Sequence, residues 1–416
     1  MRLTDIQAEV LIAGAGPAGA ATSLFLSKQK IHHIILDKAV FPRDKICGDA
    51  LSGKVVHVLN KLDPSFVSEL STGKEFLGSY GVRFVAPNNR ALEVPFSTNL
   101  AALKHPPGFI SRRLDFDDFL FQKLNPEYAT ILENTSILDL EYSTSGVNVL
   151  LDNHGEKLQV ESKIVVGAEG DRSVVAKRLA GHKKENKHYC AGLRGYYTGV
   201  TGMHPENFIE LHFLKDFLPG YLWIFPMPGG IANVGVGMLS ESVAKKNINL
   251  KTELQKALQS NPELKSRFQN ARPISELKGW GLPLGSRKRK LSGDNFLLVG
   301  DAASLIDPFT GEGIGNALTS GMVAAEQIKL SLDTNQFDAK SMSAYDSNIY
   351  SVLWDELKLS HTMQRLTNYS WLFNFVVNKA SKSKTLRDTI TCMFEDLDMR
   401  DKLRSPGFYF KLLLNR

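Results

Sequence analysis

Cysteine is scarce in this chain of 416 residues, which has three: Cys47, Cys190 and Cys392. An odd number of distant cysteines builds no disulfide framework, and their spacing matches no zinc site. The histidines are scattered, so no metal-ligand pattern is present either. We therefore expect a reducing compartment and no bound metal.

Long apolar runs are also missing. No stretch approaches the roughly 20 apolar residues that a membrane-spanning helix requires. The N-terminus carries Asp5 and Glu9, where a signal peptide would need an apolar run. We expect a cytoplasmic protein, with membrane association from outside left open.

Neither sign of charge dominates, because 50 Lys and Arg residues stand against 44 Asp and Glu residues, a net charge of +6. This mild excess permits an acidic ligand or a membrane surface and requires neither. The basic segments "HKKENKH" (182–188) and "SRKRK" (286–290) lack interleaved aromatics. They predict solvated loops and no nucleic-acid partner.

The N-terminus does contain a nucleotide-binding pattern. "EVLIAGAG" predicts a buried strand, "PAGAATSLFLSKQK" a helix and "IHHIILDK" a second strand. Gly14, Gly16 and Gly19 have G-x-G-x-x-G spacing at the turn between strand and helix, which lets a pyrophosphate approach the helix N-terminus. Asp37 ends the second strand, where its carboxylate can accept bonds from ribose hydroxyls. Together these features predict a dinucleotide-binding unit.

A second element indicates a flavin. Gly300 and Asp301 close the strand-like "NFLLVGD", and this carboxylate can accept hydrogen bonds from a ribityl chain. "PFTGEGIGNAL" (308–318) then forms a glycine-rich entry to a helix, whose N–H groups can stabilise negative charge on the flavin's pyrimidine edge. "GEGIGN" follows a loop with Pro308, not a strand, so we expect no separate NAD(P) domain.

In the rest of the chain the pattern of apolar and polar residues changes twice. Residues 131–166 alternate apolar and polar residues, as in a β-meander, and further strand-like runs occupy 191–238. From about Gly313 the pattern is mainly helical. We predict an α/β fold with a discontinuous Rossmann-type FAD-binding domain (1–60, 101–180 and 290–335), a sheet-rich substrate domain (61–100 and 181–289) and a C-terminal helical region (336–416).

The motifs "GAGPAG", "PRDKICGD", "RLDFD", "GAEGDRS" and "GDAASLIDPFTGEGIG" together resemble the geranylgeranyl reductase family. That family belongs to the FAD enzymes built like para-hydroxybenzoate hydroxylase. The motifs run from residue 14 to residue 315, about three quarters of the chain. One position departs from the pattern: Glu169 stands where the group usually has Asp.

The resemblance implies FAD as cofactor. It places Arg43 and Arg113 near the phosphates or ribose, and Asp301 on the ribityl chain. The remaining candidate cofactor contacts come from the same motifs: Pro17, Ala18, Lys38, Cys47, Gly48, Gly170, Gly300, Pro308, Gly311, Gly313 and Ile314.

"YLWIFP" (221–226) is similar to the family's Y-x-W-x-F-P stretch, which lines the substrate cavity. Tyr221, Trp223 and Phe225 alternate, so on a strand all three point to one face. Such a row also occurs in ordinary cores. With Pro226, it predicts the wall of an apolar cavity for a hydrophobic small molecule or lipid.

Cys47 lies among charges in "PRDKICGD". It is either a small buried hydrophobe or, with Arg43 and Lys45 lowering its pKa, a proton donor beside the flavin. We take Cys47 as the candidate catalytic residue.

The favoured function is reduction of a C=C bond by reduced FAD. A monooxygenase (hydroxylase or epoxidase) is the runner-up, followed by a halogenase and a non-enzymatic flavin-containing binding module. A halogenase usually carries W-x-W-x-I-P, and Tyr221 and Phe225 depart from it. The electron donor is NAD(P)H or a ferredoxin-like protein. The terminal "KLRSPGFYFKLLLNR" (402–416) predicts a docked helix or a peripheral membrane contact.

Overall fold

The computed structural model describes residues 5–383 and forms two compact units. The first comprises Met1–Lys45, Arg113–Tyr189 and Leu282–Ser360, and the second Ile46–Arg112, Cys190–Gly281 and His361–Arg416. The predicted terminal contact at 402–416, Cys392 and part of the predicted helical region lie outside the described residues.

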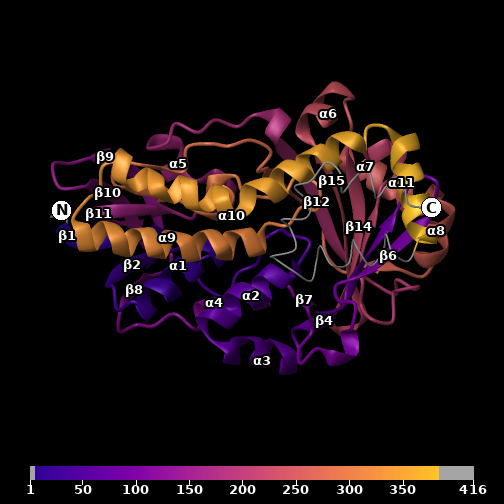
Figure 1. The fold of residues 1–416 in the computed structure, drawn as a ribbon, viewed down its shortest axis with the longest axis horizontal. Coiled ribbons are helices and arrows are strands. Elements are labelled where there is room, and N and C mark those ends of the chain that lie inside the picture. Colours follow the sequence, from indigo (N-terminus) through magenta and orange to yellow (C-terminus); the bar gives the residue numbers. More distant parts are fainter. Residues whose placement is uncertain (1–4, 384–416) are drawn as a thin grey trace. The chain divides into compact units, whose positions relative to one another are not determined.

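The first unit is built on a largely parallel sheet, which confirms the predicted α/β class (Figure 1). Strand order is β18-β19-β11-β1-β2-β8, and β9 and β10 extend β11 as the predicted meander. Its strands are β1 (Asp5–Ala13), β2 (His33–Leu36), β8 (Ala129–Leu132), β9 (Thr135–Tyr142), β10 (Val147–Asn153), β11 (Glu156–Gly167), β18 (Ser292–Gly293) and β19 (Phe296–Leu298). Its helices are α1 (Pro17–Lys28), α4 (Arg113–Phe121), α5 (Val174–Arg178), α9 (Ile314–Thr334) and most of α10 (Ala339–Leu366).

Helices α1 and α9 pack closely against each other (Figure 1). A Cβ on Gly321 of α9 would lie 2.5 Å from the carbonyl oxygen of Ala18 and 3.0 Å from the Cβ of Ala21. Small residues at this crossing therefore let α9 approach the helix that follows the glycine-rich turn.

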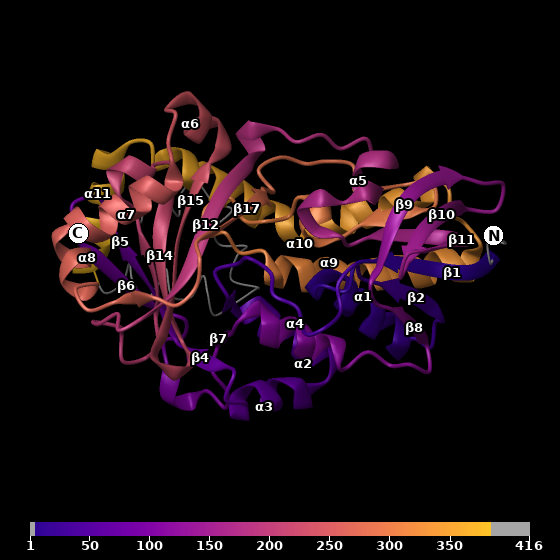
Figure 2. The same ribbon diagram turned by 180° about the vertical axis from the view of Figure 1, so that it is seen from behind.

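The second unit contains an eight-stranded sheet of order β16-β12-β15-β14-β13-β5-β6, in which β17 also pairs with β12 (Figure 2). Its strands are β5 (Gly81–Val85), β6 (Ala91–Pro95), β12 (Tyr189–Thr198), β13 (Ile209–His212), β14 (Gly220–Met227), β15 (Ile231–Leu239), β16 (Arg272–Pro273) and β17 (Lys278–Pro283). A small sheet joins β3 (Ala50–Leu51), β7 (Gly108–Ile110) and β4 (Leu77–Ser79). The helices are α2 (Gly53–Leu62), α3 (Pro64–Thr72), α6 (Ser240–Lys245), α7 (Leu250–Ser260), α8 (Pro262–Arg267) and α11 (Ser370–Lys382).

One face of the large sheet carries the unit's apolar core. Leu222 and Ile224 of β14 and Val234 of β15 cluster with Leu254 and Leu264 of helices α7 and α8. Because side chains alternate along a strand, the odd-numbered residues of β14 point to the opposite face.

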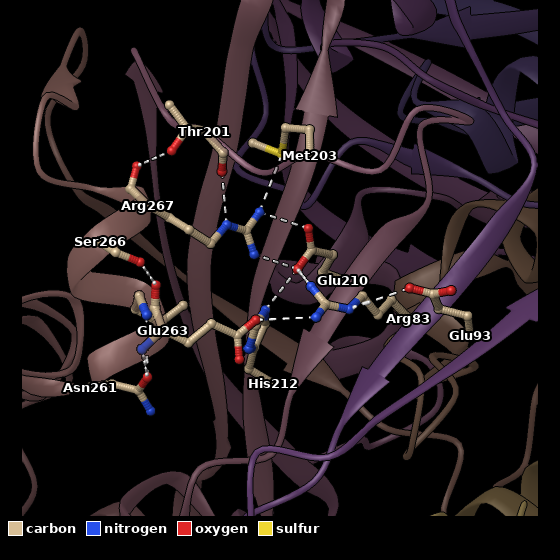
Figure 3. Close-up of polar contacts among 11 residues, drawn as sticks. Arg83, Glu93, Thr201, Met203, Glu210, His212, Asn261, Glu263, Ser266 and Arg267 are labelled. Atoms are coloured by element: carbon tan, nitrogen blue, oxygen red, sulfur yellow. Dashed lines mark hydrogen bonds and ion pairs between the residues drawn. The ribbon is translucent and has the colours of Figure 1, made fainter. Parts of the chain in front are cut away.

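A buried ion network attaches α8 to this sheet (Figure 3). The Glu210 carboxylate accepts hydrogen bonds from Arg267 (2.6 and 2.7 Å), His212 (3.0 Å) and Arg83 (3.3 Å). Arg267 also donates to the Thr201 carbonyl at 2.8 Å. The fully buried Glu210 is thus surrounded by donors, as a buried carboxylate requires.

Among the described residues, none of the helices is long and apolar enough to cross a membrane.

Candidate functional site

The glycine-rich turn of the first unit has the geometry that its spacing predicts. Gly14 has φ of +102°, and a Cβ there would lie 2.5 Å from the Ala168 carbonyl oxygen. A Cβ on Gly19 would lie 1.8 Å from the Gly14 carbonyl oxygen. Both positions therefore exclude side chains, which lets the chain turn tightly from β1 into α1.

The N-terminus of α1 can receive an anion. Its N-cap is Gly16, which offers no side-chain cap, and Pro17 occupies the first turn. The guanidinium of Arg43 approaches, with Nη2 3.3 Å from where a Cβ on Gly16 would stand. Main-chain N–H groups, the helix dipole and a cation thus fit the diphosphate of a dinucleotide.

Asp37 fixes this turn from the end of β2. Its carboxylate accepts hydrogen bonds from the main-chain N–H groups of Ala15 and Ala39, each at 3.0 Å. A carboxylate offers about four acceptor directions, so two such bonds leave capacity for the ribose hydroxyls predicted to bind there. Lys38 follows it in the chain.

Asp117 links the two arginines that the sequence singled out. It accepts bonds from Arg43 Nη1 and, in bidentate form, from Arg113 Nε (2.5 Å) and Nη2 (2.6 Å). Burial alone would raise the pKa of Asp117, but the charges and hydrogen bonds of Arg113 and Arg43 hold it below its ordinary value. Arg113 is 3% exposed, so in this structure it orients Asp117, which in turn orients Arg43.

Sequence reasoning missed Asp117, although a signal was present. Asp117 follows Arg113 by four residues in "RLDFD", the spacing that brings two side chains together on a helix.

Glu169, the departure from the family pattern, caps α5. Its carboxylate accepts bonds from the N–H groups of Val174 (3.0 Å) and Val175 (3.2 Å) and from the Ser173 hydroxyl (2.5 Å). Burial raises the pKa of Glu169 while these bonds oppose the rise. The adjacent Gly170 has φ of +76°, a left-handed turn that favours glycine.

Gly300 and Asp301 follow β19 as predicted. Gly300 has φ of +58°, and a Cβ there would lie 2.9 Å from the Cβ of Ala18 on α1. The Asp301 carboxylate accepts a bond from Lys45 Nζ at 2.9 Å. Lys45, a second residue that the site prediction omitted, thus neutralises the carboxylate expected to hold the ribityl chain.

The loop before α9 is held by its own acidic residues. Asp307 Oδ1 accepts from the N–H groups of Phe309 (2.9 Å) and Thr310 (2.8 Å), and Glu312 Oε1 accepts from Gly315 N–H (2.6 Å). Pro308, Gly311, Gly313 and Ile314, the predicted flavin-edge residues, lie in this loop and the first position of α9. Gly311 has φ of +75°.

The second unit carries the aromatic row. Adjacent ring centroids of Tyr221, Trp223 and Phe225 lie 6.3 Å apart, and all three occupy the sheet face opposite the helix-packed core. Pro226 follows on the same strand. A Cβ on Gly235, the cross-strand partner of Trp223, would lie 2.2 Å from the Trp223 ring. A Cβ on Gly48 would lie 2.9 Å from the Phe225 ring.

Asn233 joins this row to the Cys47 loop. Its Oδ1 accepts from Trp223 Nε1 at 2.9 Å, and its Nδ2 donates to the Cys47 carbonyl (2.9 Å) and to Asp49 (2.8 Å). Asp49, at φ +70°, also accepts from the Tyr196 hydroxyl at 2.6 Å. Asn233 and Asp49 are completely buried, so the Cys47 backbone is held by a polar network inside the unit.

The predicted site residues thus fall into two groups. Cys47 and Gly48 lie in the second unit with Tyr221, Trp223, Phe225 and Pro226, whereas every other candidate cofactor contact lies in the first. The Cys47 side chain is partly exposed. In residues 5–383 no group of three or more His, Cys, Asp or Glu side chains is arranged to hold a metal ion.

Comparison with known proteins agrees with this geometry. Residues 7–355 match the family model described as FAD binding domain. The chain is 30% identical to digeranylgeranylglycerophospholipid reductase from Methanococcus aeolicus, covering 88% of each chain, and 28% identical to menaquinone reductase from Mycolicibacterium smegmatis, covering 77% of this chain and 76% of that protein.

Solved structures share the fold. A geranylgeranyl bacteriochlorophyll reductase-like protein from Thermoplasma acidophilum superposes with a TM-score of 0.79 at 22% identity, over 96% of this chain and 99% of the other. A flavin-dependent brominase gives 0.77 at 21% identity, over 93% of each chain. The motifs, the dinucleotide cradle and these relatives lead to one conclusion: the chain belongs to the geranylgeranyl reductase family of FAD-dependent oxidoreductases.

Proposed function

We propose that this protein reduces carbon–carbon double bonds in an isoprenoid chain. The observation that carries the proposal is the row of Tyr221, Trp223 and Phe225, backed by a packed core on the other face of its sheet. A rigid aromatic wall suits a long hydrocarbon. The names of the relatives support this substrate class, since digeranylgeranylglycerophospholipid and menaquinone both carry isoprenoid chains.

Saturating a C=C bond adds a hydride to one carbon and a proton to the other. When bound, reduced FAD supplies the hydride. We assign the proton to the Cys47 thiol, whose backbone carbonyl is fixed by Asn233. Trp223, bonded to the same Asn233, gives the hydrocarbon a defined surface next to that loop.

The reduction itself is tested with the purified, anaerobically reduced holoenzyme. A detergent-dispersed polyprenyl lipid, added alone, should reoxidise the flavin spectrum and give a saturated product by mass spectrometry. Reoxidation only by oxygen, with an oxygenated lipid, would instead identify a monooxygenase. A requirement for halide as well would identify a halogenase, and a flavin that reductants leave oxidised would identify a binding module.

The same assay identifies the reductant. NAD(P)H and a reduced ferredoxin-like protein are each offered to the oxidised holoenzyme under argon, and bleaching of the flavin absorbance is followed. We propose that one of these two classes is the electron donor.

The role of Cys47 has its own test. Cys47→Ala should lower kcat at least tenfold and remove the alkaline limb of the kcat–pH profile, because a proton donor acts only while protonated. Cys190→Ala is the matched control: burial raises the pKa of the Cys190 thiol to about 12, so it does not titrate in the assay range. An unchanged profile in Cys47→Ala would leave Cys47 as a packing residue without affecting the reductase proposal.

A further inference from the structure

Helix α11 has two unlike faces. On one face, three side chains are buried in the second unit: Phe373, Val377 and Ala380. The centroid of the Phe373 ring lies 4.6 Å from that of the Phe213 ring. On the other side Trp371 is 69% exposed and Phe375 is 50% exposed. These two residues are four apart, so their side chains are neighbours on one exposed stripe of the helix.

Exposed large hydrophobic residues concentrate at this helix. Of the eleven such side chains among residues 5–383, four lie within ten residues of sequence: Leu366, Tyr369, Trp371 and Phe375. The other seven are spread over the rest of the chain. A local cluster that includes Trp and Tyr differs from the scattered exposure that any protein shows, and it marks an interaction surface.

The charged residues along this stretch of the sequence are all positive. Between Glu356 and Asp388 the sequence has no acidic residue, whereas it has six basic ones: Lys358, Arg365, Lys379, Lys382, Lys384 and Arg387. Lys379 continues the stripe of Trp371 and Phe375 by one turn, and Lys382 is exposed. The helix therefore presents interfacial aromatics followed by cations.

The loop beside α11 adds to the positive charge. Asn88 bonds through its N–H to Asn374 (3.2 Å) and through its side chain to Asn378 (3.3 Å), which anchors the loop to the helix. Arg90, two residues further on, is exposed.

We propose that this face of α11 binds the surface of an anionic lipid bilayer. Trp371 and Phe375 insert at the level of the headgroups, while Lys379 and Lys382 contact anionic lipids. Tryptophan and tyrosine prefer this interface, and each nearby cation adds attraction to an anionic surface.

The inference does not depend on the proposed function, because binding is measured without turnover on vesicles that contain no isoprenoid lipid. The full-length holoenzyme is sedimented with vesicles of phosphatidylcholine alone or with about one third phosphatidylglycerol. We expect binding to the anionic vesicles that weakens with salt. Equal partition into both kinds of vesicle, or none into either, would overturn the proposal.

Two pairs of variants locate the surface. W371A/F375A should weaken partition about tenfold or more, since two inserted aromatic side chains are removed. L138A/Y142A removes two exposed side chains of β9 and should leave the partition unchanged.

K379Q/K382Q should weaken binding about fivefold for each lysine at low salt. K251Q/K265Q, two exposed lysines of α7 and α8, is the control for charge. Equal effects of test and control pairs would contradict the assignment.

A spectroscopic measurement covers the case in which another segment occupies the face. Trp371 emission, assigned by difference from Trp371→Phe, should shift to the blue with anionic vesicles and be quenched by brominated lipid. If the Trp371 signal is already blue and shielded from acrylamide without vesicles, the chain's own residues or a second copy cover the stripe, and the proposal fails.

Discussion

Asn233 shows how one side chain can determine the arrangement of several others. The Trp223 indole N–H is only a donor, so it fixes the carboxamide with Oδ1 toward Trp223 and Nδ2 toward Cys47 and Asp49. The orientation of the amide therefore follows from chemistry, and it makes asparagine, but not the isosteric aspartate, suitable here.

We predict that Asn233→Asp lowers the unfolding free energy by about 2–4 kcal/mol and reduces kcat more than it raises KM. The new carboxylate cannot donate to the Cys47 carbonyl, and it places a second acid beside Asp49 in a buried site. Urea unfolding and steady-state kinetics test this, with the exposed Asn270→Asp as control. A KM effect alone would contradict the positioning role.

Two glycines of β15 provide a second test at the residue scale. A Cβ on Gly235 would lie 2.2 Å from Trp223 Cζ2 and 2.4 Å from the Leu193 carbonyl oxygen, whereas one on Gly237 meets Trp223 Cζ3 at an ordinary 3.6 Å. Gly235→Ala should thus lower stability by about 1–3 kcal/mol and shift the tryptophan fluorescence, because overpacking must displace the indole. Gly237→Ala should do neither. Similar melting curves for the two variants would argue against the close packing.

At the scale of elements, the loop that follows β2 depends on α4. Arg43 reaches the N-terminus of α1 while its guanidinium is held by Asp117, which sits one helical turn after Arg113. Helix α4 thus supplies the carboxylate that keeps a cation at the dinucleotide cradle.

Asp117→Asn should cost about 3–5 kcal/mol of stability and weaken FAD binding at least tenfold. It removes the buried counter-charge that Arg43 and Arg113 share, and the nearest carboxylate to Arg43 is then Asp37 at 3.9 Å. FAD affinity is measured by flavin fluorescence quenching on titration of apoprotein. The neighbouring Asp118→Asn, whose carboxylate bonds only locally to Gln122, should leave it unchanged. Wild-type affinity in Asp117→Asn would show that Arg43 is held by other means.

The ease of predicting an element depended on how local its cause is. The β1–α1 turn and the meander were predictable, because glycine spacing and alternation act over a few residues. The Asn233 network was not, since its partners at Asp49 and Cys47 lie 184 and 186 residues away. The basic segments at 182–188 and 286–290 differ from the solvated loops that the sequence predicts. Glu185 of the first segment pairs with Arg287 and Arg289 of the second, and the side chain of Arg289 is only 8% exposed.

At the scale of the whole molecule, the stability in acid should reflect Glu210, a buried carboxylate of the second unit. Burial alone would raise the pKa of Glu210, but hydrogen bonds from His212 and Arg267, and their charges, lower it from 4.5 to about 2. A carboxylate with a lowered folded-state pKa stabilises the protein above its unfolded pKa, and this stabilisation is lost as the pH falls.

The contribution of Glu210, about 3 kcal/mol, should therefore be complete above about pH 4.5 and disappear toward pH 2. In Glu210→Gln the unfolding free energy should be lower at pH 7 and should fall less steeply below pH 4.5. Glu263→Gln removes a peripheral partner of Arg83 and should keep the wild-type slope. Urea unfolding at stepped pH measures both, and parallel slopes for Glu210→Gln and wild type would contradict the assignment.

The division of the first unit into three stretches has a consequence during protein synthesis. Every strand of the second unit's large sheet, through β17, is synthesised before β18 and β19. Strand β1 likewise waits for its partner β11, whose pairing begins more than 150 residues later. The large sheet of the second unit can form once β17 has emerged, before helix α11 of the same unit is made. The sheet that begins at the N-terminus is completed only when Phe296–Leu298 arrives. A released chain that ends near residue 285 would therefore contain every strand of the second unit's large sheet but would lack β18 and β19 of the nucleotide-binding sheet.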